Sequence, residues 1–352
     1  MSKYIVGVWG QFGDGKQIAD GQAVRTTIIT DELKRRYGEA NVITVNTNQW
    51  KKRPISFFLE SLRMIQNSKI VAIAPADNGY KIFVPLLLLL NILFRKKLIH
   101  IVIGGFLPAL LRKKPLYLKL ENKFDIIFVQ TSNILNDLES LGVKNVAISS
   151  NPKRLQTRLF TDLKIINEKH LKLCVFSRIY KDKGVEDAIE AVKICNNRLG
   201  GRFLKLDFYG LVPDTYKERL SELLNENKDI LDYKGIIPYD QTVQYLKNYF
   251  LMLFPTFYYG EGFPGCVIDA YNSALPIIAT DWLYNSDVIL DGKTGILVPV
   301  KNPYALSDAI LKLYNDRNLH FEMAYNCLNE ADKYSPEIVL KSIFDYIDYN
   351  KK

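Results

Sequence analysis

The sequence predicts an α/β protein of two doubly wound domains that face a cleft. Two observations support this fold class. Short stretches rich in β-branched residues alternate with longer stretches of helical periodicity in both halves of the chain, as in parallel sheets that carry helices on both faces. The chain has 352 residues, of which 48% are hydrophobic, enough for about two domains with a core each.

The first domain is expected over residues 1–155. Its strands are predicted at Tyr4–Trp9, Asn41–Thr47, Ile70–Ala74, Leu98–Ile103 and Ile126–Gln130. Helical spacing of apolar residues between them is clearest at Ala23–Arg36 and Ile134–Leu141.

The second domain is expected over residues 170–333, after a polar linker at Ser149–Lys169. Its strands are predicted at Lys172–Ser177, Lys205–Tyr209, Phe250–Pro255 and Pro276–Thr280. The last segment, 334–352, is predicted to be an amphipathic helix that begins at Ser335-Pro336 and crosses back to the first domain.

The distribution of charge indicates which partners and which cellular location the protein suits. The net charge is +9, and basic residues cluster in the first third as Lys34-Arg35-Arg36, Lys51-Lys52-Arg53, Arg95-Lys96-Lys97 and Arg112-Lys113-Lys114. Such clusters suit an anionic membrane, nucleic acid or a phosphorylated acceptor, and they equally suit solvated helix ends. The N-terminus lacks the features of a secretory signal, so we expect a cytoplasmic protein.

One apolar run stands out in the first domain. Phe83–Phe94 is shorter than the roughly 20 residues that a membrane-spanning helix needs, and it contains Pro85 and Asn91. We therefore expect a buried or surface-lying helix.

A glycine-rich turn in the second domain is the strongest candidate for a ligand site. In doubly wound sheets, ligands bind beyond the carboxyl ends of the strands. The strand Phe250–Pro255 is followed by Glu261, the turn Gly262–Gly265, and a helix expected to start near Pro264. Backbone N–H groups at such a helix start suit a diphosphate or sugar hydroxyls. Asp269 lies one turn further on, so the two carboxylates would reach a sugar and a ribose, unless both merely favour the helix dipole.

Two cations follow the strand at Lys172–Ser177. Arg178 and Lys183 flank a strand-to-helix loop that ends in Gly184. Cations are disfavoured at a helix N-terminus, because that end of the dipole is already positive. An anionic ligand such as a leaving diphosphate would explain their placement, since two cations stabilise the charge that develops on it.

Together these motifs resemble the retaining family 4 glycosyltransferases of GT-B fold, whose two domains are Rossmann-like. The matching residues are Arg178-x4-Lys183-Gly184, Glu261-Gly-Phe-Pro-x4-Asp269-Ala and Leu275-Pro276-Ile-Ile-Ala-Thr280, with further matches at Phe208-Tyr209-Gly210, Lys234-Gly235-Ile236-Ile237 and Asp291-Gly-Lys-Thr-Gly-Ile-Leu-Val298. The resemblance covers the whole second domain and, weakly, the first.

The resemblance implies a retaining, hexosyltransferase-type enzyme with a nucleotide diphosphate sugar, UDP- or GDP-linked, as co-substrate. Arg178 and Lys183 would bind the donor diphosphate, and Glu261 with Gly262, Phe263, Pro264 and Gly265 would position the donor sugar. Asp269, where the family normally has Glu, would hold the ribose, and Gly210, Gly235 and Ile236 would lie around the nucleotide. The family implies no metal ion and no further cofactor, and no catalytic base is assigned.

The first loop of the chain contains a near match to a phosphate-binding P-loop. Gly10-x4-Gly15-Lys16 is followed by Gln17, where a P-loop has the Ser or Thr that ligates Mg²⁺. We interpret the loop instead as the glycine-rich first loop of family 4 enzymes, in which Gly13, Gly15 and Gly21 let the backbone approach a phosphate or sugar.

Histidine, cysteine and acidic residues give no metal motif in this sequence. The three histidines and four cysteines are scattered, and no Asp-x-Asp occurs. The family's histidine position falls near Gly104-Gly105, where this sequence has no histidine. His100 lies four residues earlier and would point into the sheet or its helix layer, so we expect a core imidazole with its hydrogen bonds satisfied.

Three other functions remain open at this point: a P-loop or Rossmann-type nucleotide enzyme, a nucleic-acid-binding protein, and a catalytically silent subunit of GT-B fold. For the acceptor, the basic clusters and the apolar helix suggest a glycan or a polyprenyl-diphosphate-linked glycan at the inner membrane face, as in bacterial surface polysaccharide assembly.

Overall fold

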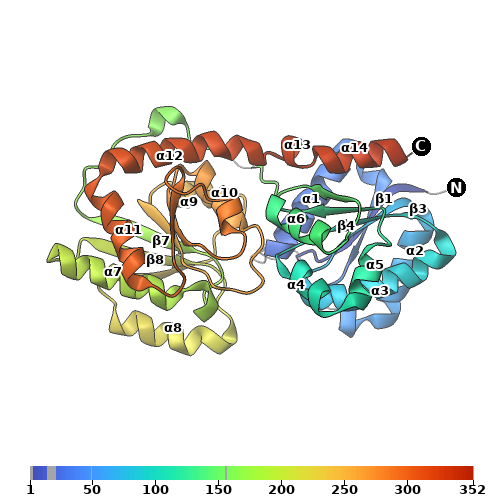
Figure 1. Ribbon diagram of the computed structural model, residues 1–352, viewed down its shortest axis with the longest axis horizontal. Helices are drawn as coiled ribbons and strands as arrows, with labels where there is room; N and C mark the ends of the chain where they lie inside the picture. The colour runs from blue at the N-terminus through green and yellow to red at the C-terminus, as the bar shows by residue number, and fades with distance from the viewer. Residues whose placement is uncertain (1–2, 14–20, 49, 155–156, 352) are drawn as a thin grey trace. The chain divides into compact units, whose positions relative to one another are not determined.

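The computed structural model describes residues 3–13, 21–48, 50–154 and 157–351, and the chain divides into two compact units (Figure 1). The first unit comprises Met1–Lys153 and Tyr334–Lys352, and the second comprises Arg154–Lys333. Each unit holds one six-stranded sheet in which every strand pair described is parallel. The predicted doubly wound α/β fold is therefore confirmed.

The sheet of the first unit has the strand order β2-β1-β3-β4-β5-β6. Its strands are β1 (Tyr4–Gly10), β2 (Val42–Asn46), β3 (Ser68–Ala74), β4 (Lys97–Ile101), β5 (Ile126–Val129) and β6 (Val146–Ile148). Its helices are α1 (Gly21–Tyr37), α2 (Pro54–Asn67), α3 (Asp77–Phe94), α4 (Phe106–Lys113), α5 (Pro115–Glu121), α6 (Ser132–Ser140), α13 (Pro336–Val339) and α14 (Lys341–Asn350).

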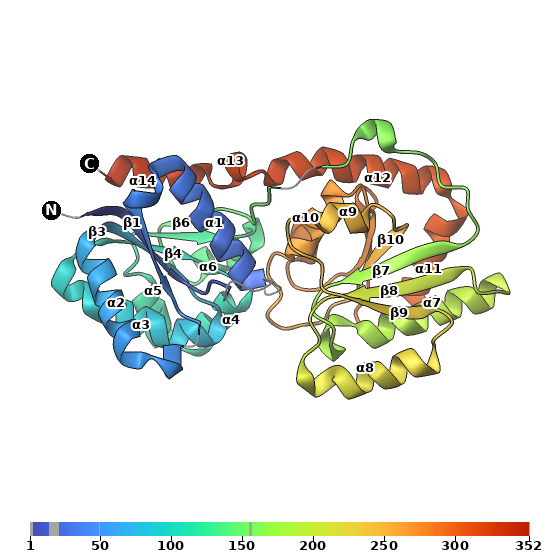
Figure 2. The same cartoon turned by 180° about the vertical axis from the view of Figure 1, so that it is seen from behind.

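Two groups of helices cover the faces of this sheet. On one face, Ile29 and Leu33 of α1 share a core with Ile343 and Ile347 of α14, over the strands (Figure 2). On the other, Trp9 of β1 packs against Phe57 of α2 and Phe83 of α3, with ring centroids 5.7 and 5.6 Å apart. The prediction of one continuous C-terminal helix is wrong in detail, because the helix is interrupted at Leu340 and forms α13 and α14.

The sheet of the second unit has the order β12-β11-β10-β7-β8-β9. Its strands are β7 (Leu171–Phe176), β8 (Leu204–Tyr209), β9 (Leu231–Gly235), β10 (Leu251–Phe254), β11 (Ile277–Thr280) and β12 (Gly295–Val298). Its helices are α7 (Val185–Leu199), α8 (Asp214–Glu226), α9 (Thr242–Leu246), α10 (Gly265–Asn272), α11 (Pro303–Asn315) and α12 (Arg317–Ala331).

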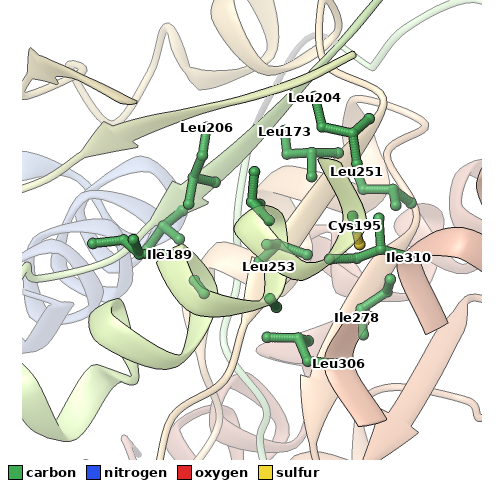
Figure 3. Packing of buried hydrophobic residues seen from close by; sticks show 14 of the residues in the cluster. Leu173, Ile189, Cys195, Leu204, Leu206, Leu251, Leu253, Ile278, Leu306 and Ile310 are labelled. Carbon is green, nitrogen blue, oxygen red and sulfur yellow. The ribbon is translucent and has the colours of Figure 1, made fainter. Parts of the chain in front are cut away.

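The core of the second unit lies between its sheet and the buried sides of α7, α8 and α11. Figure 3 shows Ile189 and Cys195 of α7 packed with Leu306 and Ile310 of α11 and with strand leucines such as Leu251. Helices α9 and α10 pack together, and α10 also packs against α12 (Figure 2). The sheet is thus covered on both faces, as its nearly continuous apolar strands require.

In each sheet, later strands lie on both sides of the first strand, and the switch point is the place where this order divides. In the second sheet this is between β7 and β10, because β8 and β9 lie on one side of β7 while β10, β11 and β12 lie on the other. In the first sheet it is between β1 and β3. Ligands of such sheets bind in the crevice at the carboxyl ends of these strand pairs.

Candidate active site at the carboxyl edge of the second sheet

Lys183 and Glu261 form a buried ion pair at the β7–β10 switch point. Lys183 ends the short 3-10 turn after β7, and Glu261 lies in the loop after β10. The Lys183 Nζ lies 2.6 Å from Glu261 Oε2, and each residue is only 7% exposed. The Thr256 hydroxyl donates a further hydrogen bond of 2.8 Å to the same carboxylate oxygen. Two residues predicted separately for the donor site are therefore brought together by the fold.

Tyr258 lies beside both predicted cations. The Lys183 Nζ is 5.0 Å from the centroid of the Tyr258 ring, and the Arg178 guanidinium carbon is 5.8 Å from the same centroid. Both distances are within cation–π range. Burial raises the pKa of the Tyr258 phenol, which keeps the ring neutral beside the two cations. Arg178 is exposed while Lys183 is buried, so one cation faces water and the other lies inside the site.

The loop after β10 is held on both sides by neighbouring strands. The Phe257 N–H donates to the Asp182 carbonyl at 2.8 Å, which ties it to the loop after β7. On the β11 side, the Thr280 hydroxyl donates to the Thr256 carbonyl, and the Trp282 indole donates to the Tyr258 carbonyl at 2.8 Å. This network fixes the backbone that leads into Glu261.

Gly184 allows the two loops of the switch point to approach. Its φ is +72°, and a Cβ at this position would lie 2.0 Å from the Pro255 carbonyl oxygen. Any other residue would both strain the backbone and push the β7 and β10 loops apart. The ion pair between Lys183 and Glu261 therefore depends on this glycine.

The glycine-rich turn leads into α10 where the sequence predicts a helix start. Gly262, Phe263 and Pro264 are buried, and α10 begins at Gly265 with Pro264 as its N-cap residue. Pro264 offers no side-chain cap, so the positive end of the helix lies next to Glu261 without a capping oxygen from that residue. This arrangement suits an anionic group or sugar hydroxyls near the turn.

Asp269 lies inside α10 and is 1% exposed. Its Oδ1 accepts a hydrogen bond of 2.7 Å from the hydroxyl of Thr242, the first residue of α9. The structure thus gives the carboxylate a fixed position between α9 and α10. Its role toward a ribose stays a prediction.

Gly210 follows β8, Gly235 is the last residue of β9, and Ile236 follows it, all at the same edge of the sheet. Gly210 has a φ of +140°, and a Cβ there would lie 1.7 Å from the Ser177 carbonyl oxygen at the end of β7. It donates its N–H to the Gly235 carbonyl at 2.9 Å. The close approach of the ends of β7, β8 and β9 therefore requires a glycine at position 210, independently of any ligand.

The predicted residues of the first loop belong to the other unit. Gly13 is the last described residue before the gap, and Gly21 is the first residue of α1. Gly15 lies outside the described residues, as do Lys16 and Gln17 of the near P-loop match.

His100 is buried within the first unit, as the sequence predicts. Its Nδ1 lies 2.5 Å from Glu121 Oε1, and the Tyr80 hydroxyl donates to Glu121 Oε2 at 2.6 Å. The expectation of a fully satisfied imidazole is wrong in one respect, because Nε2 is buried without a hydrogen-bond partner in the described part of the chain. No cluster of three or more His, Cys, Asp or Glu side chains that could hold a metal occurs among the described residues.

The sequence reasoning assigned no role to Thr256, Tyr258, Trp282 or Thr242. The first two follow β10 directly, so the rule that points to residues after strands would have found them. Trp282 follows β11 by two residues, so the same rule would have pointed to it. Thr242 carries no such signal, because it acts through Asp269, 27 positions away.

Comparison with known proteins gives a family match within the second unit. Residues 161–330 match the family model described as glycosyl transferases group 1. The chain is 26% identical to the capsular polysaccharide biosynthesis glycosyltransferase CapM of Staphylococcus aureus over 183 residues, which are 51% of this chain and 46% of that protein. It is 27% identical to the poly(ribitol-phosphate) alpha-N-acetylglucosaminyltransferase of Staphylococcus aureus (strain COL) over 231 residues, 62% of this chain and 43% of that protein. The matches span less than half the length of these relatives.

Solved structures share the fold over nearly the whole chain. Anabaena HepE in complex with UDP superposes with a TM-score of 0.76 over 99% of this chain and 100% of that one, at 12% identity. Sucrose-phosphate synthase from Thermosynechococcus elongatus gives 0.76 over 98% of both chains, at 13% identity. The chain therefore has the two-domain GT-B fold.

Proposed function

We propose that this chain, whose residues 161–330 match the group 1 glycosyl transferases, transfers a sugar with retention from a nucleotide diphosphate sugar to a glycan or lipid-linked glycan. The observation that carries the proposal is the buried Lys183–Glu261 pair at the β7–β10 switch point. A buried pair is a weak source of stability, because the desolvation of two charges offsets most of their attraction. Its position where doubly wound sheets bind ligands supports a functional reason.

Lys183 is suited to hold the donor diphosphate. An ammonium group has three N–H donors, and Glu261 takes one of them, which leaves two for ligand oxygens. Arg178, whose guanidinium also lies near the Tyr258 ring, adds a second cation that reaches solvent. Together they would stabilise the negative charge that develops on the leaving diphosphate as the glycosidic bond breaks.

Glu261 and the turn after it are suited to position the transferred sugar. Lys183 and Thr256 hold one oxygen of the Glu261 carboxylate, so the carboxylate is oriented before a substrate arrives. Glu261 would bind sugar hydroxyls together with the backbone of Gly262, Phe263 and Pro264. The acceptor hydroxyl would then attack the sugar from the side on which the diphosphate leaves, which accounts for retention. The cationic side chains would neutralise the diphosphate in place of a metal ion.

The names of the relatives support an acceptor in bacterial surface polysaccharide assembly. CapM is named for capsular polysaccharide biosynthesis, and the second relative acts on poly(ribitol phosphate). The complex of HepE with UDP supports a UDP-linked donor over a GDP-linked one. A cytoplasmic location fits such a donor.

A panel of nucleotide sugars tests the proposal. A ligand that binds the folded state at a hundred times its Kd stabilises that state by about 2.7 kcal/mol, so the true donor is expected to raise the melting temperature by several degrees in EDTA. The same donor should then release its nucleoside diphosphate in an assay with glycan acceptors. If no nucleotide sugar shifts the melting temperature, with or without Mg²⁺, the proposal is wrong.

A further inference from the structure

The outer helices of the first unit expose aliphatic side chains where a helix of a globular domain normally presents polar ones. We define the α2–α3 face by its most exposed apolar residues: Ile55, Phe58, Leu59, Ile82, Leu89, Ile92 and Leu93. The two helices lie side by side in both views (Figures 1 and 2). Leu93, Ile55 and Ile92 are 76%, 75% and 68% exposed.

Helix α3 is apolar on two opposite sides. Its buried side includes Phe83, Leu87 and Leu90, and Phe83 packs against Trp9 of β1. Its exposed side carries Ile82, Leu89 and Ile92 at helical spacing. Of the described helices, α3 alone is long and apolar enough to span a membrane, and only 28% of it is buried. Because its buried side belongs to the core, we expect it to lie along a surface and not to leave the domain.

Positive charge is concentrated in the part of the chain that carries this face. Residues 50–124, which contain α2 to α5, have 14 Lys and Arg residues and three Asp and Glu residues. This segment has a net charge of +11, against +9 for the whole chain, so the remainder is slightly acidic. Exposed basic residues lie at the start of α2, at the end of α3 and around the α4–α5 junction, as Lys51, Lys52, Arg95, Lys113 and Lys114.

We infer that the α2–α3 face docks on an anionic lipid bilayer, with its aliphatic side chains in the headgroup region and its basic residues on the anionic headgroups. Apolar burial and electrostatic attraction add in this kind of binding. A second copy of the chain is a poorer occupant, because two such faces would bring two strongly positive surfaces together. Nucleic acid is also poorer, because it offers no apolar phase for exposed isoleucines and leucines.

This inference goes beyond the proposed function, because it concerns a surface of the first unit, while the donor residues Arg178, Lys183 and Glu261 belong to the second. It adds that the acceptor is met at a membrane surface. Vesicle binding can be measured without donor or acceptor, so the two proposals fail independently.

Cosedimentation of the full chain with vesicles tests the inference. One set of vesicles is pure phosphatidylcholine, and the other contains about one third phosphatidylglycerol. We expect at least about tenfold stronger partitioning to the anionic vesicles, weakened by added salt. Sugar transfer without any vesicle binding would overturn this inference alone, and vesicle binding without sugar transfer would overturn the proposed function alone.

Paired substitutions test whether vesicle binding depends on the α2–α3 face or on any exposed apolar residue. Ile92→Ser with Leu93→Ser should reduce partitioning about tenfold or more, because both side chains would enter the headgroup region. The matched control, Leu159→Ser with Tyr304→Ser, changes residues of the second unit that are 64% and 65% exposed and should have no effect. All four residues are exposed, and unchanged melting temperatures would show that each variant is folded.

Charge variants test the basic residues in the same way. Lys113→Gln with Lys114→Gln should weaken partitioning and reduce its salt dependence, whereas Lys205→Gln with Lys228→Gln on the second unit should not. Equal binding to neutral and anionic vesicles would contradict the inference. Self-association in analytical ultracentrifugation would also contradict the inference if vesicle binding is absent and Ile92→Ser with Leu93→Ser abolishes the self-association. The same holds for binding to RNA.

Discussion

The two units share a sheet architecture but use it differently. Each has six parallel strands and one switch point. At the second unit's switch point, Lys183 and Glu261 meet in a buried ion pair supported by Thr256. At the first unit's switch point, the described loop residues 10–13 and 75–76 carry no charge, and loop residues 14–20, which include Asp14, Lys16 and Asp20, lie outside the described residues. The strand order alone therefore gives a switch point in both units, and the described side chains place a buried ion pair at the second one.

Loss of Lys183 is expected to have the largest effect on the second unit. Lys183→Ala should lower the turnover number at least about a hundredfold, because a preorganised cation at the leaving group is lost. Lys181→Ala, which removes an exposed lysine from the same loop, should change turnover little. Steady-state kinetics with the donor identified by the panel gives the comparison.

The stability of this variant must be separated from its chemistry. Lys183→Ala leaves the Glu261 charge buried without its partner, at a cost of about 3–5 kcal/mol. Replacing both charges, with Lys183→Gln and Glu261→Gln, should restore much of the unfolding free energy and leave transfer lost. Sugar transfer by Lys183→Ala at the wild-type rate would contradict the role proposed for the switch point of the second unit.

Gly184 tests whether the switch point needs the close approach of its loops. Gly184→Ala should lower the free energy of unfolding by roughly 3–5 kcal/mol, because a Cβ would overlap the Pro255 carbonyl and the φ of +72° disfavours alanine. Gly235→Ala is the control, since its φ is +84° with nothing within 4 Å of the added Cβ, and it should cost only about 1 kcal/mol. Similar losses in urea unfolding of the two variants would show that the contact at Gly184 is unimportant.

His320 makes the second unit sensitive to acid. Burial lowers the pKa of His320 to about 4, from 6.5. The unfolded chain therefore binds this proton at higher pH than the folded chain, so stability is full above pH 6.5 and falls as the pH drops toward 4, by at most about 3 kcal/mol. His320→Gln should flatten urea unfolding free energies across this window. A variant with the wild-type pH profile would exclude His320 as the cause.

Thr242 gives the smallest expected effect and tests the ribose assignment. Thr242→Val removes the hydroxyl that donates to Asp269, at a cost of about 1–2 kcal/mol to the positioning of that carboxylate. Nucleoside diphosphate should then bind about tenfold more weakly, while inorganic diphosphate, which has no ribose, should bind as before. Equal weakening of both ligands in calorimetry would argue for a general disturbance of the site.

The sequence predicts most of the fold, and the strands that it misses share a position. β6, β9 and β12 all lie at sheet edges, where one side of the strand has no neighbour. Edge strands are less completely buried than central ones, so β9, with the sequence Leu-Asp-Tyr-Lys-Gly, lacks the continuous apolar run that marks β7 or β10. The central strands were predictable because their burial dictates their composition.

The site was predictable in its members but not in their pairing. Lys183 and Glu261 are 78 residues apart, and they meet only because β7 and β10 are neighbours in the sheet. Strand order cannot be read from local periodicity. For the same reason the sequence gives no sign that Gly210 faces the Ser177 carbonyl or that Thr242 supports Asp269.

A crystal structure with the nucleoside diphosphate of the preferred donor tests the central claim most directly. We predict that the diphosphate oxygens lie within hydrogen-bond distance, about 2.7–3.2 Å, of the Lys183 ammonium at the carboxyl ends of β7 and β10. A diphosphate bound instead at the carboxyl ends of β1 and β3, with the Lys183–Glu261 pair untouched, would contradict the account.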